Sequence, residues 1–430
     1  MLFFKECKKI LRSLSFWIFF VITALMFFTQ YFNDGKFRAS EYTGGYKIVE
    51  NHEQIMNEAI NTLMGEYTSN NYVCYPYGFY KAVSLKEKKK EKVEIYIQEM
   101  MGVDHNGIED ILESHLQEWL NTDHEGIEVY LESTSSDSIM DFFSQCPENR
   151  FDDLTVKSDL TYERFTEIMG EIDDILGGGS DFAVDALVFN YSRVDMTDED
   201  SLKQYEAFIK YDRITYALAR LFSDYMGIDL AFLPVFVSAV FVAADRRRRM
   251  SELVYSRSIS SFKLVFTRYA ALVVTMFIPI IVFMMIAFIQ AKVVYSGEKM
   301  SMSAMFTLPT FWLLPNIMVA TASGMLLTEV FSAGIAIAFQ CVWAFRCLMS
   351  GSVALAGDIG KFDLICRHNS TFDRDIFMQC FNDFVFNRIF FMVISLLAVC
   401  IAAYVYDLKR GGKFNGFKLF GEGGLLRRKA

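Results

Sequence analysis

The sequence is poor in the residues that mark several special classes of protein. Among its 430 residues it has 6 prolines, 8 cysteines and 25 glycines, and no segment recurs at a fixed period. These low counts exclude a collagen-like chain and a small disulfide scaffold, and the missing period excludes a repeat array. Hydrophobic residues make up 53% of the chain. An ordinary soluble domain is already ~45–50% apolar when its glycines are counted as apolar. Composition alone therefore leaves the fold class open.

Familiar catalytic and nucleotide-binding motifs are also missing. The chain has no Gly-x-x-x-x-Gly-Lys-Ser/Thr run, Gly-x-Ser-x-Gly elbow, His-Glu-x-x-His pair or Cys-x-x-Cys knuckle. Neighbouring acids such as Asp173 and Asp174 point to different faces of a helix and make a poor acid–base pair. We therefore expect that the chain is not an enzyme by itself and that it binds no metal or other cofactor directly.

Charge, in contrast, is sharply separated along the chain, whose net charge is −10. Residues 33–228 hold 39 acidic and 17 basic side chains, a net charge of −22, whereas the other 234 residues carry +12. The basic part also contains the long runs of Phe, Ile, Val and Met. This separation argues against a single soluble globule and against a disordered chain.

The first apolar run covers residues 14–32 and has no charged side chain, so it is long enough to cross ~30 Å of hydrocarbon as a helix. A cleaved signal peptide is the alternative. It is disfavoured because no small-x-small cleavage site follows, and because the run exceeds the ~7–15 residues of a signal core. Five further apolar runs follow the acidic segment: 225–244, 269–290, 304–327, 330–348 and 387–406.

The basic residues predict how these six spans are oriented. Residues 1–13 carry four Lys or Arg, 245–263 carry six and 407–430 carry seven. Six crossings place all three clusters on one side, which the positive-inside rule assigns to the cytoplasm. We therefore expect a multi-pass protein of the cell membrane with both termini cytoplasmic. Four parts are predicted: 1–32 with the first span, the extracellular domain 33–228, the spans within 229–406, and the basic tail 407–430.

The extracellular domain is expected to be mostly helical. A capping box opens at Thr197 and leads into a helical pattern that continues to the second span, so one long helix is predicted there. A second helix is predicted over 161–176, ended by glycine, with weaker candidates over 53–67 and 108–120. Alternation favours strands over 93–97 and 127–131.

The histidines of this domain and four cysteines outside the membrane leave two alternatives open. His105, His115 and His124 lie among acids at spacings that match no compact metal site, so a solvated acidic surface is favoured over a metal site. Two cysteine pairs, Cys74–Cys146 and Cys366–Cys380, lie outside the membrane in the predicted topology. Each pair is open to a disulfide or to two free thiols.

The most informative stretch is the arginine segment, residues 245–263, which lies between the second and third predicted spans. Its four consecutive arginines are attracted to an anionic leaflet by ~1 kcal/mol each, so a simple juxtamembrane anchor is one interpretation. Met250, Leu253 and Val254 share one helical face, which favours a short helix along the membrane surface. Ser260 or Ser261 is expected to cap the next helix.

The arginine segment resembles the cytoplasmic segment of the ABC-2 type transporter permeases, which reads approximately acidic-Arg-x-x-Gly-Thr-x-Glu-x-Leu-x-Ser-x-Pro-Ile-Ser. The positions that match are Asp245, Arg246, Glu252, Ser256, Ile259 and Ser260. The positions that depart from it are Arg249, Met250, Val254 and Ser258. In that family the segment is a coupling helix that docks into a groove of the ATPase subunit. The resemblance therefore implies a coupling helix over about 246–262 that contacts the ATPase through Asp245, Arg246, Arg249, Glu252, Leu253, Ser256, Arg257 and Ile259.

The layout of the chain is similar to one branch of the same family, which has six spans and a large outer domain between the first two. The implied fold is an all-α membrane protein with six transmembrane helices and a mostly helical extracellular domain between them. The tight turn at Thr328-Glu329, expected to be solvated, fits that layout. So does an outer segment before the last span, for which 377–386 is a candidate re-entrant helix.

The implied function is that of a permease subunit of an exporter. It works with a separate ATPase that binds ATP and Mg²⁺, and with a second permease copy or a sister permease, in the lipid membrane and without nucleic acid. A membrane-anchored sensor or immunity protein with an extracellular ligand-binding domain is the alternative, disfavoured because five later spans exceed what an anchor requires. Arg346 in the fifth span is a candidate for the substrate path. Snorkelling to the outer interface is favoured for it instead.

Overall fold

The computed structural model describes residues 2–32, 45–76, 80–121, 151–247, 259–349, 359–368 and 370–414. The chain forms two compact units, Gly44–Met196 and the combination of Met1–Thr43 with Thr197–Ala430. We call the first the inserted unit and the second the helical bundle. The described residues are mainly helical, which confirms the predicted all-α class.

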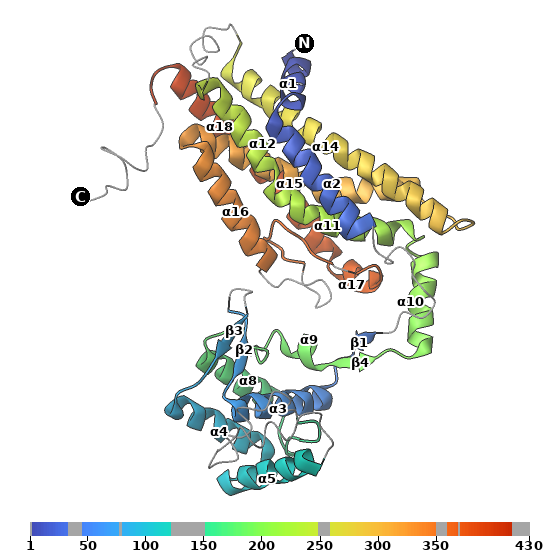
Figure 1. The fold of residues 1–430 in the computed structure, drawn as a ribbon, viewed down its shortest axis with the longest axis vertical. Coiled ribbons are helices and arrows are strands. Elements are labelled where there is room, and N and C mark those ends of the chain that lie inside the picture. Colours follow the sequence, from blue (N-terminus) through green and yellow to red (C-terminus); the bar gives the residue numbers. More distant parts are fainter. Residues whose placement is uncertain are drawn as a thin grey trace, which may run out of the picture. The chain divides into compact units, whose positions relative to one another are not determined.

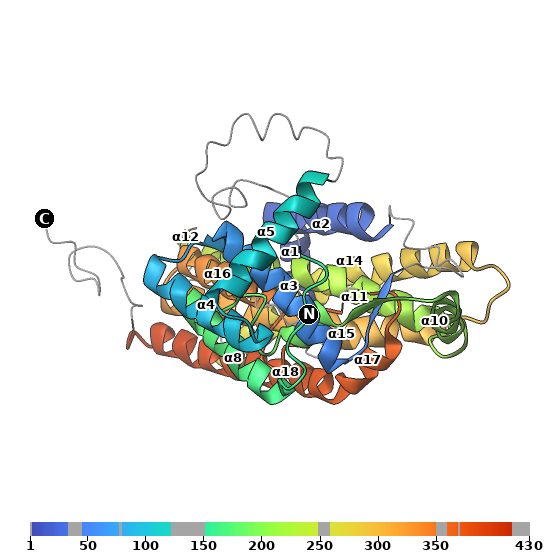
Figure 2. The same cartoon turned by 90° about the horizontal axis from the view of Figure 1, so that it is seen from below.

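The helical bundle is built around one central helix. Figure 1 shows α15 in the middle of the bundle, and helices α11, α12, α14, α16 and α18 all pack against it. Helix α1 lies beside α14, as both views show (Figures 1 and 2). The elements in chain order are α1 Leu2–Leu11, α2 Leu14–Met26, the π-helical turn Phe27–Phe32, α10 Asp198–Lys210, α11 Thr215–Phe232, α12 Pro234–Arg247, α14 Ser261–Val294, α15 Met302–Val330, α16 Ala333–Met349, α17 Arg374–Gln379 and α18 Phe381–Arg410.

Within the described residues, five helical stretches are long and apolar enough to cross a membrane. They are Leu14–Phe32, Thr215–Ala244, Ser261–Val294, Met302–Val330 and Phe381–Arg410. The predicted span 330–348 corresponds to α16, which is apolar but only 17 residues long, short of the ~20 residues that a spanning helix needs. The helices thus indicate a membrane-embedded, multi-pass protein, and the sixth span and the orientation stay predictions.

Close approach of α12 and α15 depends on a glycine. A Cβ atom built on Gly324 would lie 2.1 Å from Ser238 Oγ and 3.2 Å from Ser238 Cβ, and both residues are in apolar helices. Small residues at such crossings let the helix backbones approach each other, which is the main source of packing between helices in a membrane.

We expect Gly324→Ala to destabilise the bundle by about 1–3 kcal/mol, because the added methyl group has no space beside Ser238. Thermal unfolding of the purified chain in detergent measures this, and Ser238→Ala in the same chain should recover part of the loss. The matched control is Gly334→Ala in α16, where nothing lies within 4 Å of the built Cβ. An equal loss in both variants would contradict the packing argument.

The turn predicted at Thr328-Glu329 is misplaced. Both residues are buried in the last turn of α15, which ends at Val330, and α16 begins at Ala333. Glu329 is not solvated, because the Lys409 ammonium of α18 lies 3.0 Å from its Oε2. This ion pair supplies the partner that a carboxylate needs to remain buried.

The single long helix predicted after Thr197 is also wrong. Thr197 does form the capping box with Asp200, but α10 ends at Lys210 and α11 starts at Thr215. Between them Arg213 and Ile214 have positive φ angles of 46° and 60°, a strain of about 1–3 kcal/mol for each residue. The ion pair of Asp212 with Arg220, 2.6 Å apart and nearly fully buried, stabilises this break. The helical sequence pattern runs through the break and does not reveal it.

The inserted unit contains helices around one apolar core and two small antiparallel pairs of strands. Strand β1 Tyr46–Ile48 pairs with β4 Arg193–Asp195, with Lys47 opposite Val194, and β2 Tyr72–Cys74 pairs with β3 Lys81–Val83, with Val73 opposite Ala82. The helices are α3 His52–Ser69, α4 Glu87–Met101, α5 His105–Asn121, α8 Tyr162–Leu176 and α9 Leu187–Tyr191. Ile60, Leu63, Ile97, Phe165 and Ile168 are among its fully buried residues.

Helix termini in the inserted unit follow the sequence signals. Gly177 ends α8 at a φ of 107°, as predicted, and the Thr161 side chain caps the start of α8 by accepting from the Arg164 backbone N–H. The helices predicted over 53–67 and 108–120 are confirmed as α3 and α5. The strand predicted over 93–97 is wrong, because α4 runs through it and buries Val93 and Ile97 on one helical face. The strand predicted over 127–131 lies outside the described residues.

The alternatives left open for cysteine and histidine are partly resolved. Cys74 and Cys366 are buried free thiols, so neither forms the disulfide considered for it, and Cys146 lies outside the described residues.

His105 Nδ1 is 2.6 Å from Glu94 Oε1. The Glu94 hydrogen bond raises the pKa of the exposed His105 ring. The His115 ring stacks on Phe151, and His124 is not among the described residues.

Candidate functional site

The arginine segment is only partly described by the structure. Asp245 and Arg246 belong to the last turn of α12, which ends at Arg247, and the chain is described again from Ile259. The other predicted coupling residues, which are Arg249, Glu252, Leu253, Ser256 and Arg257, lie outside the described residues. The coupling helix predicted over about 246–262 therefore stays a prediction, except that α14 already begins at Ser261.

The C-terminal boundary of the arginine segment is held by polar contacts from α18. Arg410 Nη1 donates to the Ile259 carbonyl at 2.6 Å, and Ser261 Oγ donates to Asp407 Oδ1 at 2.6 Å. Ser260 caps α14, as predicted, by accepting from the Lys263 backbone N–H at 3.3 Å. Such a cap contributes about 1 kcal/mol. The segment is thereby attached to the ends of two apolar helices.

The same end of the bundle carries further buried charges. We call it the proximal end, defined by Glu6, Arg268 and Arg410. The Glu6 carboxylate, 1% exposed, lies 3.1 Å from Lys9 Nζ and 3.9 Å from Arg268 Nε, which joins α1 to α14. Together with the pair of Glu329 and Lys409 between α15 and α18, these contacts connect four helices. Charges taken out of water at such a site must be paired, so the contacts specify how the helix ends meet.

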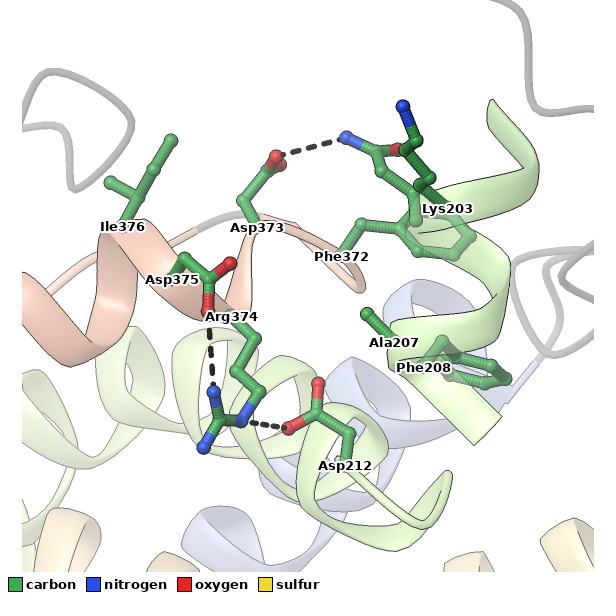
Figure 3. A pocket seen from close by; sticks show the side chains of 10 residues that line it. Lys203, Ala207, Phe208, Asp212, Phe372, Asp373, Arg374, Asp375 and Ile376 are labelled. Atoms are coloured by element: carbon green, nitrogen blue, oxygen red, sulfur yellow. Dashed lines mark hydrogen bonds and ion pairs between the residues drawn. The ribbon is translucent and has the colours of Figure 1, made fainter. Parts of the chain in front are cut away.

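The opposite end, which we call the distal end and define by Phe32, Thr215 and Phe381, carries a second group of charges. Asp212 accepts two hydrogen bonds from Arg220, at 2.8 and 2.6 Å, and Arg220 is 2% exposed. Arg374 of α17 points toward Asp212, with Nε 3.7 Å from Oδ1, and its Nη1 is 3.2 Å from Asp375 (Figure 3). One carboxylate thus faces two guanidinium groups.

A neighbouring pair holds the chain that precedes α17. Asp224 of α11 is fully buried and lies 3.1 Å from Arg367 Nε, and it also accepts from the His368 backbone N–H at 2.7 Å. Burial, and then the nearby Arg220 guanidinium, lower the pKa of His368 to about 4. The imidazole is therefore neutral at pH 7 and does not add to the positive charge.

Arg388 of α18 is a fully buried arginine whose partners are neutral in the described part of the chain. Its Nη1 donates to Trp312 O at 3.0 Å and to Asn316 Oδ1 at 2.7 Å, and its Nη2 donates to Leu364 O at 3.0 Å and Cys366 Sγ at 2.9 Å. Asn387 donates to the carbonyls of Gly360, Lys361 and Asp363. The two side chains fix residues 360–366 against α15 and α18. We did not single out Arg388 from the sequence, although a charge inside an apolar run is the signal that reveals it.

The predicted substrate-path residue Arg346 has different surroundings. Its side chain is 61% exposed at the end of α16, and Nη2 lies 2.5 Å from Asp363 Oδ1. Among the arginines that the structure describes, Arg388 is the most deeply buried, with no exposed surface. Arg346 therefore holds the segment of residues 360–366 through Asp363.

Two pockets lie at the distal end. The α10 pocket, about 210 Å³, is shown in Figure 3 and is lined by Lys203, Gln204, Ala207, Phe208, Asp212 and the residues of 372–376. The distal pocket, about 350 Å³, shares Asp212 and Arg374 with it. It is lined by Tyr211, Asp212, Tyr216, Arg220, Thr307, Leu308, Arg374, Phe377, Met378 and Phe381.

Comparison with protein-family models, with curated proteins and with solved structures returned no match to this chain. The class of protein therefore rests on the fold. The chain is a mostly helical, membrane-embedded, multi-pass protein with a separate inserted unit.

Proposed function

We propose that the chain is the permease subunit of an ABC-2 type ABC transporter, an exporter that moves a substrate across the membrane. Energy comes from a separate ATPase subunit, which binds ATP and Mg²⁺, so the chain is not an enzyme by itself. The complete transporter contains two permease units, the second a copy of this chain or a sister permease. The inserted unit of this chain lies outside the cell.

The observation that carries the proposal is the attachment of the arginine segment to the helix ends. Arg410 holds the Ile259 carbonyl, and Asp407 accepts from Ser261, so a force on the segment reaches α14 and α18 directly. The ion pair of Lys409 in α18 with Glu329 in α15 transmits the same force to α15. A partner that grips the segment differently in its ATP-bound and ATP-free states would therefore shift the arrangement of these helices.

The direct test is copurification of the tagged full-length chain from its native membrane, followed by identification of bound proteins by mass spectrometry. We expect an ATPase subunit in about equal amount, and ATP hydrolysis that depends on its presence. Native mass spectrometry of the complex gives the number of permease units. Recovery of the chain without any ATPase would favour the sensor or immunity protein and would overturn the proposal.

We expect Glu252→Lys to separate ATP hydrolysis from transport, because it reverses a charge at the proposed ATPase contact. The ATPase should still hydrolyse ATP while export falls at least tenfold, measured as ATP-dependent uptake of labelled substrate into inverted vesicles. The control is Glu298→Lys, an exposed residue in the turn after α14 at the distal end. Normal export by Glu252→Lys would count against the assigned contact.

A further inference from the structure

The distal pocket lies where three apolar helices begin. Tyr216 is the second residue of α11, Leu308 lies in the second turn of α15, and Phe381 is the first residue of α18. All three helices are long enough to cross a membrane. The pocket is therefore at the depth where apolar helix surfaces give way to polar chain, which corresponds to an interface between lipid tails and headgroups.

One wall of the distal pocket is positively charged. Its charged residues are Asp212, Arg220 and Arg374, so two guanidinium groups exceed one carboxylate. Arg220 and Asp212 are both nearly fully buried and compensate each other through two hydrogen bonds. The more exposed Arg374 therefore supplies the excess positive charge of this wall, to which an anionic ligand would bind.

Arg374 is available to the same ligand. Its contact with Asp375 involves a carboxylate that is 88% exposed, and such surface pairs contribute only ~0–1 kcal/mol. A phosphate can therefore replace Asp375 with a charge-assisted, bidentate contact. The N-terminal ends of α11 and α18 add a favourable potential for an anion.

The remaining walls are apolar or aromatic. Tyr211 and Tyr216 are 58% and 40% exposed, and Met378 is 45% exposed. Tyrosine concentrates at membrane interfaces because its ring is apolar and its hydroxyl is polar. A small soluble anion would leave these surfaces uncovered, whereas an amphiphile would cover them and meet Arg374 at the same time.

We propose that the distal pocket binds one phospholipid. Its phosphate contacts Arg374, and one acyl chain lies over Tyr216, Leu308 and Phe381. This inference depends on the bundle being embedded in a membrane and not on the proposed ATPase partner, so failure of one leaves the other standing.

The test uses the purified full-length chain after lipid removal in detergent. Thermal unfolding is followed with added phosphatidylglycerol, with inorganic phosphate and with uncharged diacylglycerol. We expect phosphatidylglycerol alone to raise the unfolding midpoint, by about 3 °C at saturation. Native mass spectrometry should show one lipid retained per chain. An equal rise with inorganic phosphate or with diacylglycerol would overturn the assignment to a phospholipid.

Substitutions test whether the rise in the unfolding midpoint arises from lipid bound in the distal pocket. Arg374→Gln should lose at least half of the midpoint rise, whereas Lys361→Gln should keep it, because Lys361 pairs with Asp383 outside the pocket. Met378→Glu places a carboxylate at an exposed pocket residue and should also lose the rise, which decides the question if Arg374→Gln does not fold. A full rise in either variant would overturn the site.

Discussion

Arg388→Met is expected to destabilise the bundle by about 3 kcal/mol or more. The substitution removes hydrogen bonds from a charged donor to Trp312 O, Asn316 and Leu364 O, and each such bond contributes ~1.5–3 kcal/mol. The acceptors left behind belong to fully buried residues, and a buried acceptor that loses its donor costs free energy. Lysine cannot substitute, because a single ammonium group cannot reach acceptors on both sides of the planar fork.

The Cys366 thiol provides a local measurement of this change. It is fully buried and lies 2.9 Å from Arg388 Nη2. We expect its alkylation, followed by peptide mass spectrometry, to become at least tenfold faster in Arg388→Met, together with a lower unfolding midpoint in detergent. Arg346→Met is the matched control, since Arg346 also holds residues 360–366, through Asp363, but is 61% exposed. Unchanged protection of Cys366 in Arg388→Met would contradict this account.

Asp212→Asn should also be strongly destabilising. It leaves Arg220, 2% exposed, without its counter-charge, and breaking a buried ion pair in this way typically costs 3–5 kcal/mol. The strained backbone at Arg213 and Ile214 would lose the contact that stabilises it. Limited proteolysis between α10 and α11 and the unfolding midpoint both report the loss.

The comparison for this variant is Asp375→Asn. Asp375 also contacts Arg374, but its side chain is 88% exposed, so its removal should cost less than 1 kcal/mol. The double variant of Asp212→Asn with Arg220→Met should recover stability relative to Asp212→Asn, because it removes the unpaired charge. Equal effects of Asp212→Asn and Asp375→Asn would show that burial does not set the strength of these pairs.

Local signals in the sequence predicted the helices and several of their ends correctly. The Ser260 cap, the capping box at Thr197 and the stop at Gly177 each depend on residues within a few positions of one another. The apolar runs predicted the helices of the bundle because length and hydropathy are also local properties. The strand predicted over 93–97 failed because its alternation also fits one face of α4.

The candidate sites depended on long-range contacts and could be predicted only in part. The arginine segment stands out in the sequence, but its attachment to Arg410 and Asp407 joins residues about 150 positions apart. Arg388 was visible as a charge in an apolar run, yet its partners come from α15 and the segment before α17. The distal pocket combines residues of α11, α15, α17 and α18, and no spacing in the sequence connects them.

By itself, the sequence determined that this is a helical, membrane-embedded protein with an acidic inserted unit, because hydropathy and charge act along the chain without regard to its path. Only the tertiary structure decided where the buried charges find their partners. Asp212 meets Arg220 across a break in a helical pattern, and Glu329 meets Lys409 across two helices. Burial makes an unpaired charge so costly that these partners fix the path of the chain where its local preferences leave it open.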